Sequence, residues 1–378
     1  GVSRGTQMTV DLECDDLVIG AGVLGLAVAT ECAKQGRSTV LLEQHPQFGQ
    51  ETSSRNSEVI HSGIYYPVNS RKTHYCLSGR EKLYAYCAEK NIQHVQTGKF
   101  VIASNADETA YLEKLHAHAK NLGVLVERVT GAEVQRREPL IRCSEALYFS
   151  RTGIVDSHQL MQSLENDLQH LGGLVGYRHS VMGAQRDSQG FTLEVNSPDG
   201  TLLARCQRLF NSAGLGAAAF SNALLKTQRY EHRFCRGRYF TLSSRYEGKF
   251  HSLVYPVPQK DGLGVHVTVD CAGNARLGPD VDWIEERSYP ALQRFYDCDW
   301  DAVLPQFLAA VRKYCPSLEQ NALSPGLIGI RPKLFIDGEA KPDFLIENFD
   351  GYVHLLGIES PGLTSALAIA PHAASLQA

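Results

Sequence analysis

Two histidines and one arginine are of the types that would take a proton from an anionic substrate and hold that substrate in place. His61 lies in the polar run 52–67, "TSSRNSEVIHSGIYYP", and His266 lies in the alternating stretch "GVHVTVD". An imidazole has an unperturbed pKa near neutral pH and therefore suits a general base. Arg331 offers a planar guanidinium that matches a carboxylate, and Pro332 stiffens the backbone beside it. These residues favour base-assisted chemistry on a carboxylic acid, with either histidine as the base.

A glycine-rich turn follows the first apolar stretch and opens a helix. Its residues are Gly20, Ala21, Gly22, Val23, Leu24 and Gly25. In a G-x-G-x-x-G turn the glycines allow a tight bend, close approach of a pyrophosphate and close packing of helix on strand. Glu43 ends the next strand, near the offset expected of a carboxylate that binds a ribose. The segment predicts a bound dinucleotide.

Two later segments indicate which dinucleotide is bound. Residues 211–219 read as a strand that runs into Ala213, Gly214 and a small-residue turn. Residues 357–370 read as a turn that opens a helix, with the candidate ligands Gly357, Ser360, Pro361, Gly362, Leu363 and Thr364. A helix N-terminus aimed at a flavin stabilises the negative charge of its reduced form. Together with the glycine turn, these segments predict FAD rather than NAD.

Strands and helices that would position these residues can be read along the chain. Residues 15–43 are expected to form a strand, a helix that ends at Gly36 and a second strand. A hairpin turn is expected at Pro198-Asp199-Gly200. The other expected helices span about 70–90, 107–121, 157–171 and 300–314. The other expected strands lie at 98–104, 173–177, 190–214 and within 238–280.

This order predicts an α/β fold in which a Rossmann-type FAD-binding domain is interleaved with an antiparallel-sheet α+β substrate domain. The chain of 378 residues, 43% of them hydrophobic, is long enough for two domains. The expected FAD-binding segments are 1–95, 150–228 and 325–378. The expected substrate-binding segments are 96–149 and 229–324.

Composition argues against several classes of protein. The net charge is −4 and the basic residues are scattered, so no nucleic-acid partner is expected. No apolar run approaches the ~20 residues of a membrane span, so no transmembrane segment is expected, and peripheral membrane contact stays open. Ten cysteines without a C-x-x-C pair indicate neither a disulfide framework nor a metal site. The chain has no P-loop, H-E-x-x-H or G-x-S-x-G motif.

Short segments in a fixed order resemble the D-amino-acid oxidase superfamily of FAD enzymes. They are "NSEVIHSGIYY" (56–66), "LYAYC" (83–87), "TGIVD" (152–156), "YPVP" (255–258), "LGVHVT" (263–268), "LGP" (277–279) and "GIRP" (329–332). Within that superfamily the chain most resembles the L-2-hydroxyglutarate dehydrogenases and oxidases, over about residues 15–370. It departs from them at Ser54-Arg55 and Glu58, where that family usually has Gly-His and Gly.

The resemblance implies roles for the polar run and for Arg331. The residues expected beside the pyrophosphate and ribityl chain of FAD are Thr52, Ser53, Ser54, Arg55, Asn56 and Ser57. His61 is expected near the isoalloxazine ring. Relatives that oxidise amino acids bind the substrate carboxylate with the arginine of a similar Gly-x-Arg-Pro segment, which implies the same role for Arg331. A surface ion pair with Asp337 or Glu339 is the alternative for Arg331.

The expected reaction is FAD-dependent oxidation of a small L-2-hydroxy acid, with L-2-hydroxyglutarate to 2-oxoglutarate as the favoured case, by hydride transfer to flavin N5. A dicarboxylate needs a second cation, for which Arg238, Arg236 and Arg55 are candidates. Tyr66 and Tyr255 are expected to donate hydrogen bonds to the substrate, with ordinary packing as the alternative.

Oxidation of an amino acid or of glycerol 3-phosphate is the rival enzymatic reading, and a non-catalytic FAD-binding protein is the rival from another class. An amine substrate predicts ammonia release, and a phosphate ester predicts a denser cluster of Lys and Arg than "GIRPKL" offers. The electron acceptor is left open between oxygen, a quinone and a carrier protein. An intracellular location is expected, cytoplasmic in a bacterium or mitochondrial in a eukaryote.

Overall fold

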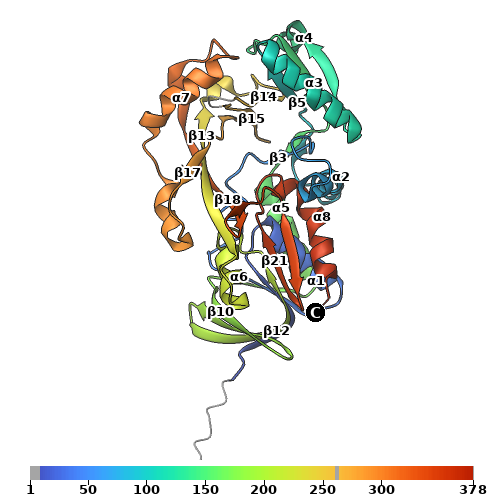
Figure 1. The fold of residues 1–378 in the computed structure, drawn as a ribbon, viewed down its shortest axis with the longest axis vertical. Coiled ribbons are helices and arrows are strands. Elements are labelled where there is room, and N and C mark those ends of the chain that lie inside the picture. Colours follow the sequence, from blue (N-terminus) through green and yellow to red (C-terminus); the bar gives the residue numbers. More distant parts are fainter. Residues whose placement is uncertain (1–8, 260–263, 378) are drawn as a thin grey trace, which may run out of the picture.

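A computed structural model describes residues 9–259 and 264–377 of the chain. Its two large sheets lie toward opposite ends of the molecule, with β10 and β12 at one end and α3, α4 and α7 at the other (Figure 1). A short three-stranded sheet consists of β3 (Val59–Ile60), β8 (Gly153–Val155) and β4 (His94–Val95).

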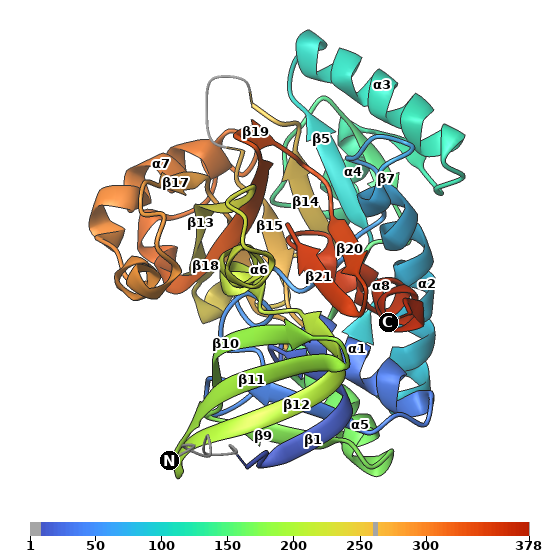
Figure 2. The ribbon, with the colours of Figure 1, turned by 60° about the horizontal axis from the view of Figure 1, so that its bottom comes forward.

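The first sheet has eight strands around a parallel centre. They are β10 (Ser180–Asp187), β11 (Gly190–Ser197), β12 (Gly200–Asn211), β1 (Leu12–Ile19), β2 (Thr39–Glu43), β9 (Leu174–Tyr177), β20 (Leu345–Phe349) and β21 (Tyr352–Leu356). The parallel strands β9, β2, β1, β12 and β21 bring their carboxyl ends to one edge of the sheet. Figure 2 shows β10, β11, β12 and β1 following one another across the sheet. Ligands of open parallel sheets bind at such an edge.

A buried ion pair joins the centre of this sheet to the C-terminal helix. Both carboxylate oxygens of Asp16 on β1 accept from Arg208 on β12 at 2.8 Å, and Arg37 adds a third contact at 2.8 Å. Arg208 also donates to the carbonyls of Ala374 and Leu376 at 2.8 Å. Burial raises the pKa of Asp16, but the arginine hydrogen bonds outweigh burial and leave the pKa below its ordinary value.

The second sheet has ten strands and is largely antiparallel. They are β19 (Glu339–Ala340), β18 (Leu323–Ile336), β13 (Tyr230–Leu242), β16 (Ala275–Leu277), β15 (Val267–Val269), β14 (Leu253–Pro256), β5 (Lys99–Ala103), β7 (Glu145–Phe149), β6 (Glu127–Thr130) and β17 (Asp282–Ile284). The longest pairing joins β13 to β18, from Tyr230 opposite Ile336 to Leu242 opposite Leu323. These two strands run from the end of the molecule that carries α7 to the edge of the first sheet (Figure 1).

Eight α-helices are described in the structure. They are α1 (Val23–Lys34), α2 (Arg71–Lys90), α3 (Ala106–Asn121), α4 (Gly131–Arg137), α5 (Ser157–His170), α6 (Ala217–Leu225), α7 (Trp300–Arg312) and α8 (Gly362–Ser375). The almost wholly buried α1 packs against α5 and α8, and α2 also packs against α8. Small residues suit this contact: a Cβ on Gly79 of α2 would lie 2.3 Å from the carbonyl oxygen of Thr364.

The helices and the hairpin expected from the sequence are confirmed to within a few residues. Gly36 follows α1 with a φ of 78°, and Ser197 pairs with Gly200 at the expected hairpin turn. One detail differs, because β15 begins at Val267 and His266 lies just before the strand. The α/β fold class is confirmed.

The division into domains stays a prediction. The strand β18, of which residues 325–336 were expected with the FAD-binding segments, lies in the ten-stranded sheet beside β13. Within the described residues no helix is long and apolar enough to cross a membrane. All ten cysteines are free.

Candidate active site

A cavity of about 1520 Å³ runs from the glycine turn to the face of the ten-stranded sheet. It is lined by the first turn of α1, the polar run, the turn before α8 and parts of β13, β14 and β18. Of the residues expected at the cofactor, it brings together Gly20, Gly22, Val23, Leu24, Gly25, Glu43, Thr52, Ser53, Arg55, Asn56, Ser57, Ala213, Gly214, Ser360, Pro361, Gly362 and Leu363. Of those expected at the substrate, it brings together His61, His266, Arg331, Tyr66 and Tyr255.

Four other expected residues are not on the cavity wall. Ser54 is exposed, and the N–H of Gly357 donates to His232 Nε2 at 3.0 Å. Thr364 lies behind the wall, where its Oγ1 accepts from the N–H of His61 at 3.0 Å. Arg238 is held by Asp280, with Nη2 and Nε 2.6 and 2.8 Å from Oδ2.

The glycine turn has no room for side chains at the expected positions. A Cβ on Gly20, where φ is +98°, would lie 2.4 Å from the carbonyl oxygen of Ser212. A Cβ on Gly25 would lie 1.7 Å from the carbonyl oxygen of Gly20, and one on Gly22 would lie 2.7 Å from Ser53 Oγ. The turn therefore leaves the N-terminus of α1 open to a phosphate group.

Side-chain oxygens around this turn fit a dinucleotide. Ser53 Oγ accepts from the N–H of Val23 at 3.0 Å, in the first turn of α1. Glu43 accepts from the N–H groups of Ala21 at 2.9 Å and His45 at 3.0 Å, which fixes its carboxylate at the cavity wall. Thr52 lines the cavity, and its hydroxyl is buried without a hydrogen-bond partner among the described residues. An orphaned buried hydroxyl beside a phosphate-binding turn is what a bound cofactor would satisfy.

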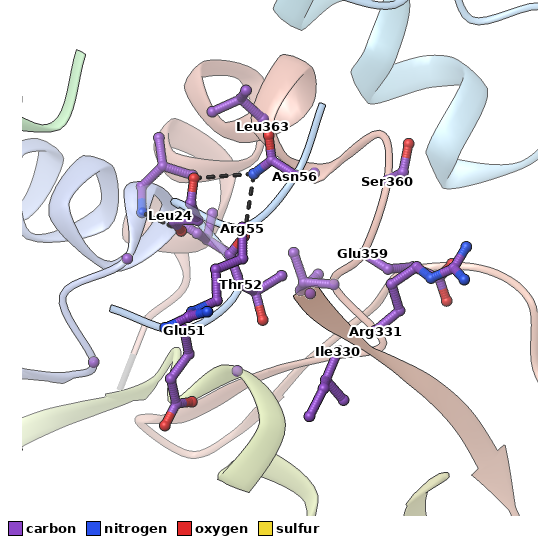
Figure 3. Close-up of a pocket in the computed structure, with 18 of the residues that line it drawn as sticks. Leu24, Glu51, Thr52, Arg55, Asn56, Ile330, Arg331, Glu359, Ser360 and Leu363 are labelled. Carbon is purple, nitrogen blue, oxygen red and sulfur yellow. Dashed lines mark hydrogen bonds between the residues drawn. The ribbon is translucent and has the colours of Figure 1, made fainter. Parts of the chain in front are cut away.

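The polar run is shaped by its own backbone contacts. Asn56 Nδ2 donates to the carbonyls of Thr52 at 3.1 Å and Ser53 at 2.9 Å (Figure 3). Strand β18 passes close by, since a Cβ on Gly329 would lie 2.1 Å from the carbonyl oxygen of Arg55. The glycine of "GIRP" thus permits the contact that carries Arg331 to the cavity. Figure 3 shows Arg331 and Ser360 on the side of the cavity remote from Leu24.

His61 is anchored at both its backbone and its ring. Its N–H donates to Thr364, and its Nε2 lies 3.2 Å from Ser360 Oγ in the turn before α8. Burial, followed by the positive charge of Lys99, lowers the pKa of His61 to about 3. The imidazole is therefore neutral at physiological pH and able to accept a proton.

His266 is held by stacking on Tyr255. Burial, followed by the charges of Lys99, His61 and Arg331, lowers the pKa of His266 to about 3. Two neutral imidazoles from distant parts of the chain therefore line the same cavity.

Arg331 has no carboxylate partner among the described residues. Its Nη2 donates to the carbonyl of Asp280 at 3.0 Å, and its Nε is buried without a hydrogen-bond partner. The alternative of a surface ion pair is wrong, because Asp337 pairs with Arg229 and Glu339 pairs with Lys341. The guanidinium is thus positioned by the backbone and leaves donors for an anion.

The other expected cations are already engaged. Arg236 pairs with Asp282 at 2.8 Å, while Arg238 is bound to Asp280. Arg55 lines the cavity, but its guanidinium lies 4.5 Å from the ring centroid of Tyr296 and donates to two backbone carbonyls.

Two further residues, Tyr239 and Lys99, were not expected at the site from the sequence. Tyr239 lines the cavity, and its hydroxyl lies 2.9 Å from Ser57 Oγ. Lys99 is buried at the start of β5, with its Nζ close to the rings of Tyr65 and Tyr255. The one available signal for Lys99 was a charged residue that opens an otherwise apolar strand.

The fold and the cofactor cradle are those of a flavoprotein oxidoreductase. Residues 15–376 match the family of FAD dependent oxidoreductases, and the chain belongs to that family. The expected cofactor, FAD, and the expected class of enzyme, an oxidoreductase, are confirmed.

Two L-2-hydroxyglutarate dehydrogenases resemble the chain over nearly its whole length. The chain is 39% identical to the mitochondrial L-2-hydroxyglutarate dehydrogenase of Arabidopsis thaliana, over 99% of this chain and 86% of that protein. It is 26% identical to the L-2-hydroxyglutarate dehydrogenase of Escherichia coli (strain K12), over 96% of this chain and 92% of that protein. The expected resemblance is thereby confirmed.

A solved structure shares the whole architecture. The dithionite-reduced L-α-glycerophosphate oxidase from Mycoplasma pneumoniae, with FAD bound, superposes with a TM-score of 0.85 at 25% identity. The match covers 96% of this chain and 94% of that one.

Proposed function

We propose that this protein oxidises L-2-hydroxyglutarate to 2-oxoglutarate. The observation that carries the proposal is a guanidinium without a carboxylate partner in the described part of the chain, on a cavity wall shared with two neutral imidazoles. The names of the relatives at 39% and 26% identity agree with this substrate.

Each of the cavity residues expected at the substrate has a part in the proposed reaction. Arg331 binds the carboxylate next to the reacting carbon, and its backbone contacts fix its orientation. Either His61 or His266 accepts the proton of the substrate hydroxyl. Tyr66 and Tyr255 line the cavity and supply hydroxyl donors to the substrate.

When bound, FAD would supply the acceptor for the hydride of the substrate α-carbon. The residues that would hold it are those of the glycine turn, Glu43, Thr52 and Ser53, with the first turn of α8 on the other side. The turn before α8 also carries Ser360, which lies 3.2 Å from the ring of His61. The turn before α8 thus contacts His61 and also precedes the helix turn that would hold FAD.

Replacing Arg331 by Gln tests the proposal. Loss of the bidentate contact is expected to raise KM for L-2-hydroxyglutarate by on the order of 100-fold, while the spectrum of the bound flavin stays unchanged. Arg229→Gln, which breaks the surface pair with Asp337, is the matched control and should leave KM unchanged. An unaltered KM in Arg331→Gln would remove Arg331 from the substrate site.

A second candidate substrate is L-glycerol 3-phosphate, because the glycerophosphate oxidase shares the fold at a TM-score of 0.85. A phosphate ester would place a dianion at Arg331, yet Arg236 and Arg238 are paired with aspartates. This arrangement favours a carboxylate. Reduction of the bound flavin by glycerol 3-phosphate but not by L-2-hydroxyglutarate would reverse the order.

We infer an intracellular location, cytoplasmic in a bacterium or mitochondrial in a eukaryote. The inference rests on relatives that include mitochondrial proteins of eukaryotes and proteins of bacteria. The acceptor of the electrons is oxygen, a quinone or a carrier protein, and reoxidation of the reduced protein by each in turn distinguishes them.

A further inference from the structure

We infer that Lys99 is the second cation of the substrate site and stabilises the distal carboxylate of a dicarboxylic substrate from behind the rings of Tyr65 and Tyr255. This inference rests on the proposed function and deepens it, because it explains how a diacid is selected over a monoacid.

Lys99 lies immediately behind the substrate end of the cavity. It is the first residue of β5, which is paired with β14 on one side and β7 on the other, and it is 1% exposed. Its Nζ lies 4.5 Å from the ring centroid of Tyr255 and 4.6 Å from that of Tyr65. Both tyrosines line the cavity. The ammonium therefore lies close to two tyrosine rings that form part of the cavity wall.

No counter-ion of Lys99 is present among the described residues, whose hydrogen bonds and ion pairs leave its Nζ without a partner. The rings that cover it are those of Tyr65 and Tyr255. The other titratable groups that interact with its charge are the thiol of Cys76 on α2 and the imidazoles His61 and His266. None of these carries a negative charge at neutral pH, since burial raises the pKa of Cys76 to about 12 and raises those of the phenols. Burial lowers the pKa of Lys99 to about 7. A buried ammonium without a partner is unfavourable, and an entering carboxylate would relieve that penalty.

The other lysines near this wall are compensated. Lys333 Nζ lies 2.5 Å from Glu359, and the buried Lys72 lies 3.9 Å from the same carboxylate. Arg331 and Lys99 together would supply two positive charges, which equal the charge of a dicarboxylate. Both cations lower the pKa of His266. Lys99 Nζ also lies 4.5 Å from the ring centroid of Tyr255, on which His266 stacks. A substrate anchored by one carboxylate at Arg331 would share the cavity with Tyr255, the ring that covers Lys99.

Calorimetric binding of glutarate and pentanoate to the FAD-loaded protein tests the inference without turnover. Both acids have five carbons and no hydroxyl group, and they differ in the second carboxylate. Glutarate is expected to bind on the order of 100-fold more tightly. At pH 8 a lysine with a pKa of about 7 is mostly neutral. Binding of glutarate should therefore be accompanied by the uptake of close to one proton, because its distal carboxylate restores the charge of Lys99. Binding of pentanoate should be accompanied by no proton uptake.

Lys99→Met keeps the volume and removes the charge, so it should abolish both the glutarate preference and the proton uptake. Lys72→Met, which removes another buried lysine but one paired with Glu359, should retain both. Equal binding of the two acids by the unaltered protein would overturn the inference, as would an equal loss for both acids in Lys99→Met. The proton uptake of the unaltered protein keeps the test decisive even if Lys99→Met fails to fold.

The proposed function can fail separately. If L-2-hydroxyglutarate reduces the bound flavin but glutarate shows no preference or proton uptake, only the role of Lys99 is wrong. If glutarate binds as expected but L-2-hydroxyglutarate leaves the flavin oxidised, the diacid site stands and the proposed reaction falls.

Discussion

The imidazole of His266 lies flat against the ring of Tyr255, with the ring centroids 3.5 Å apart and the planes 6° apart. This stack fixes the ring in the cavity wall, and no carboxylate of the described residues is hydrogen-bonded to it, although such a partner would raise the pKa of a histidine. His61, which lines the same cavity, is fixed instead by Ser360 and Thr364. Both histidines are therefore oriented and neutral.

Neutral histidines predict the pH dependence of the reaction. Because burial lowers the pKa of His61 and His266 to about 3, protonation should not inactivate the base until the pH falls well below 5. For L-2-hydroxypentanoate, whose side chain carries no charge, kcat/KM should stay flat on the acidic side down to about pH 5. An acidic limb near the ordinary histidine value of about 6.5 would contradict neutral, buried imidazoles.

The same assay identifies the base. Replacing the histidine that accepts the proton by Gln should lower kcat by ~100-fold or more, whereas replacing the other should mainly raise KM. Equal, small losses in both variants would show that neither histidine takes the proton.

The orphaned hydroxyl of Thr52 predicts a loss of cofactor affinity without a loss of fold. Thr52→Val keeps the shape and removes the hydroxyl, so the dissociation constant for FAD should rise about fivefold, as expected for one hydrogen bond of about 1 kcal/mol. Ser243→Ala is the control, because its hydroxyl is also buried without a partner but lies off the cavity. Fluorescence titration of the apoprotein with FAD measures both. The same affinity in all three proteins would remove Thr52 from the cofactor contacts.

The buried pair of Asp16 and Arg208 predicts a large effect on stability. Arg208→Met leaves a carboxylate of 0% exposure without its main partner, so the free energy of unfolding should fall by about 3–5 kcal/mol. Arg205→Met, on the same strand but paired with the exposed Asp187, should change stability little. Urea unfolding at pH 7 compares the two variants. Equal losses would show that burial of the pair does not govern its contribution.

Local sequence patterns predicted most of the fold and the cofactor site. The spacing of Gly20, Gly22 and Gly25 is a local property of one turn, and so is the position of Glu43 at the end of its strand. Each follows from the geometry of consecutive residues, which a single sequence contains. The order of helices and strands is local in the same sense.

The substrate site depends on contacts that no local pattern contains. Arg238 is an apparent free cation in the sequence, but Asp280, 42 residues further on, holds its guanidinium. Lys99 reads as the polar end of a strand, and only the parallel pairing of β5 with β14 places Tyr255 over its ammonium. Residue types alone therefore predicted a substrate role for Arg238, which is already paired with Asp280, and did not single out the buried Lys99.

Anaerobic mixing of L-2-hydroxyglutarate with the FAD-loaded protein tests the proposed oxidation. The oxidised flavin band, near roughly 450 nm for an FAD redox cofactor, should bleach rapidly with the L isomer and not with the D isomer. One equivalent of 2-oxoglutarate should form for each flavin reduced. A flavin that stays oxidised with the L isomer, or that bleaches equally with both isomers, would contradict the proposed reaction.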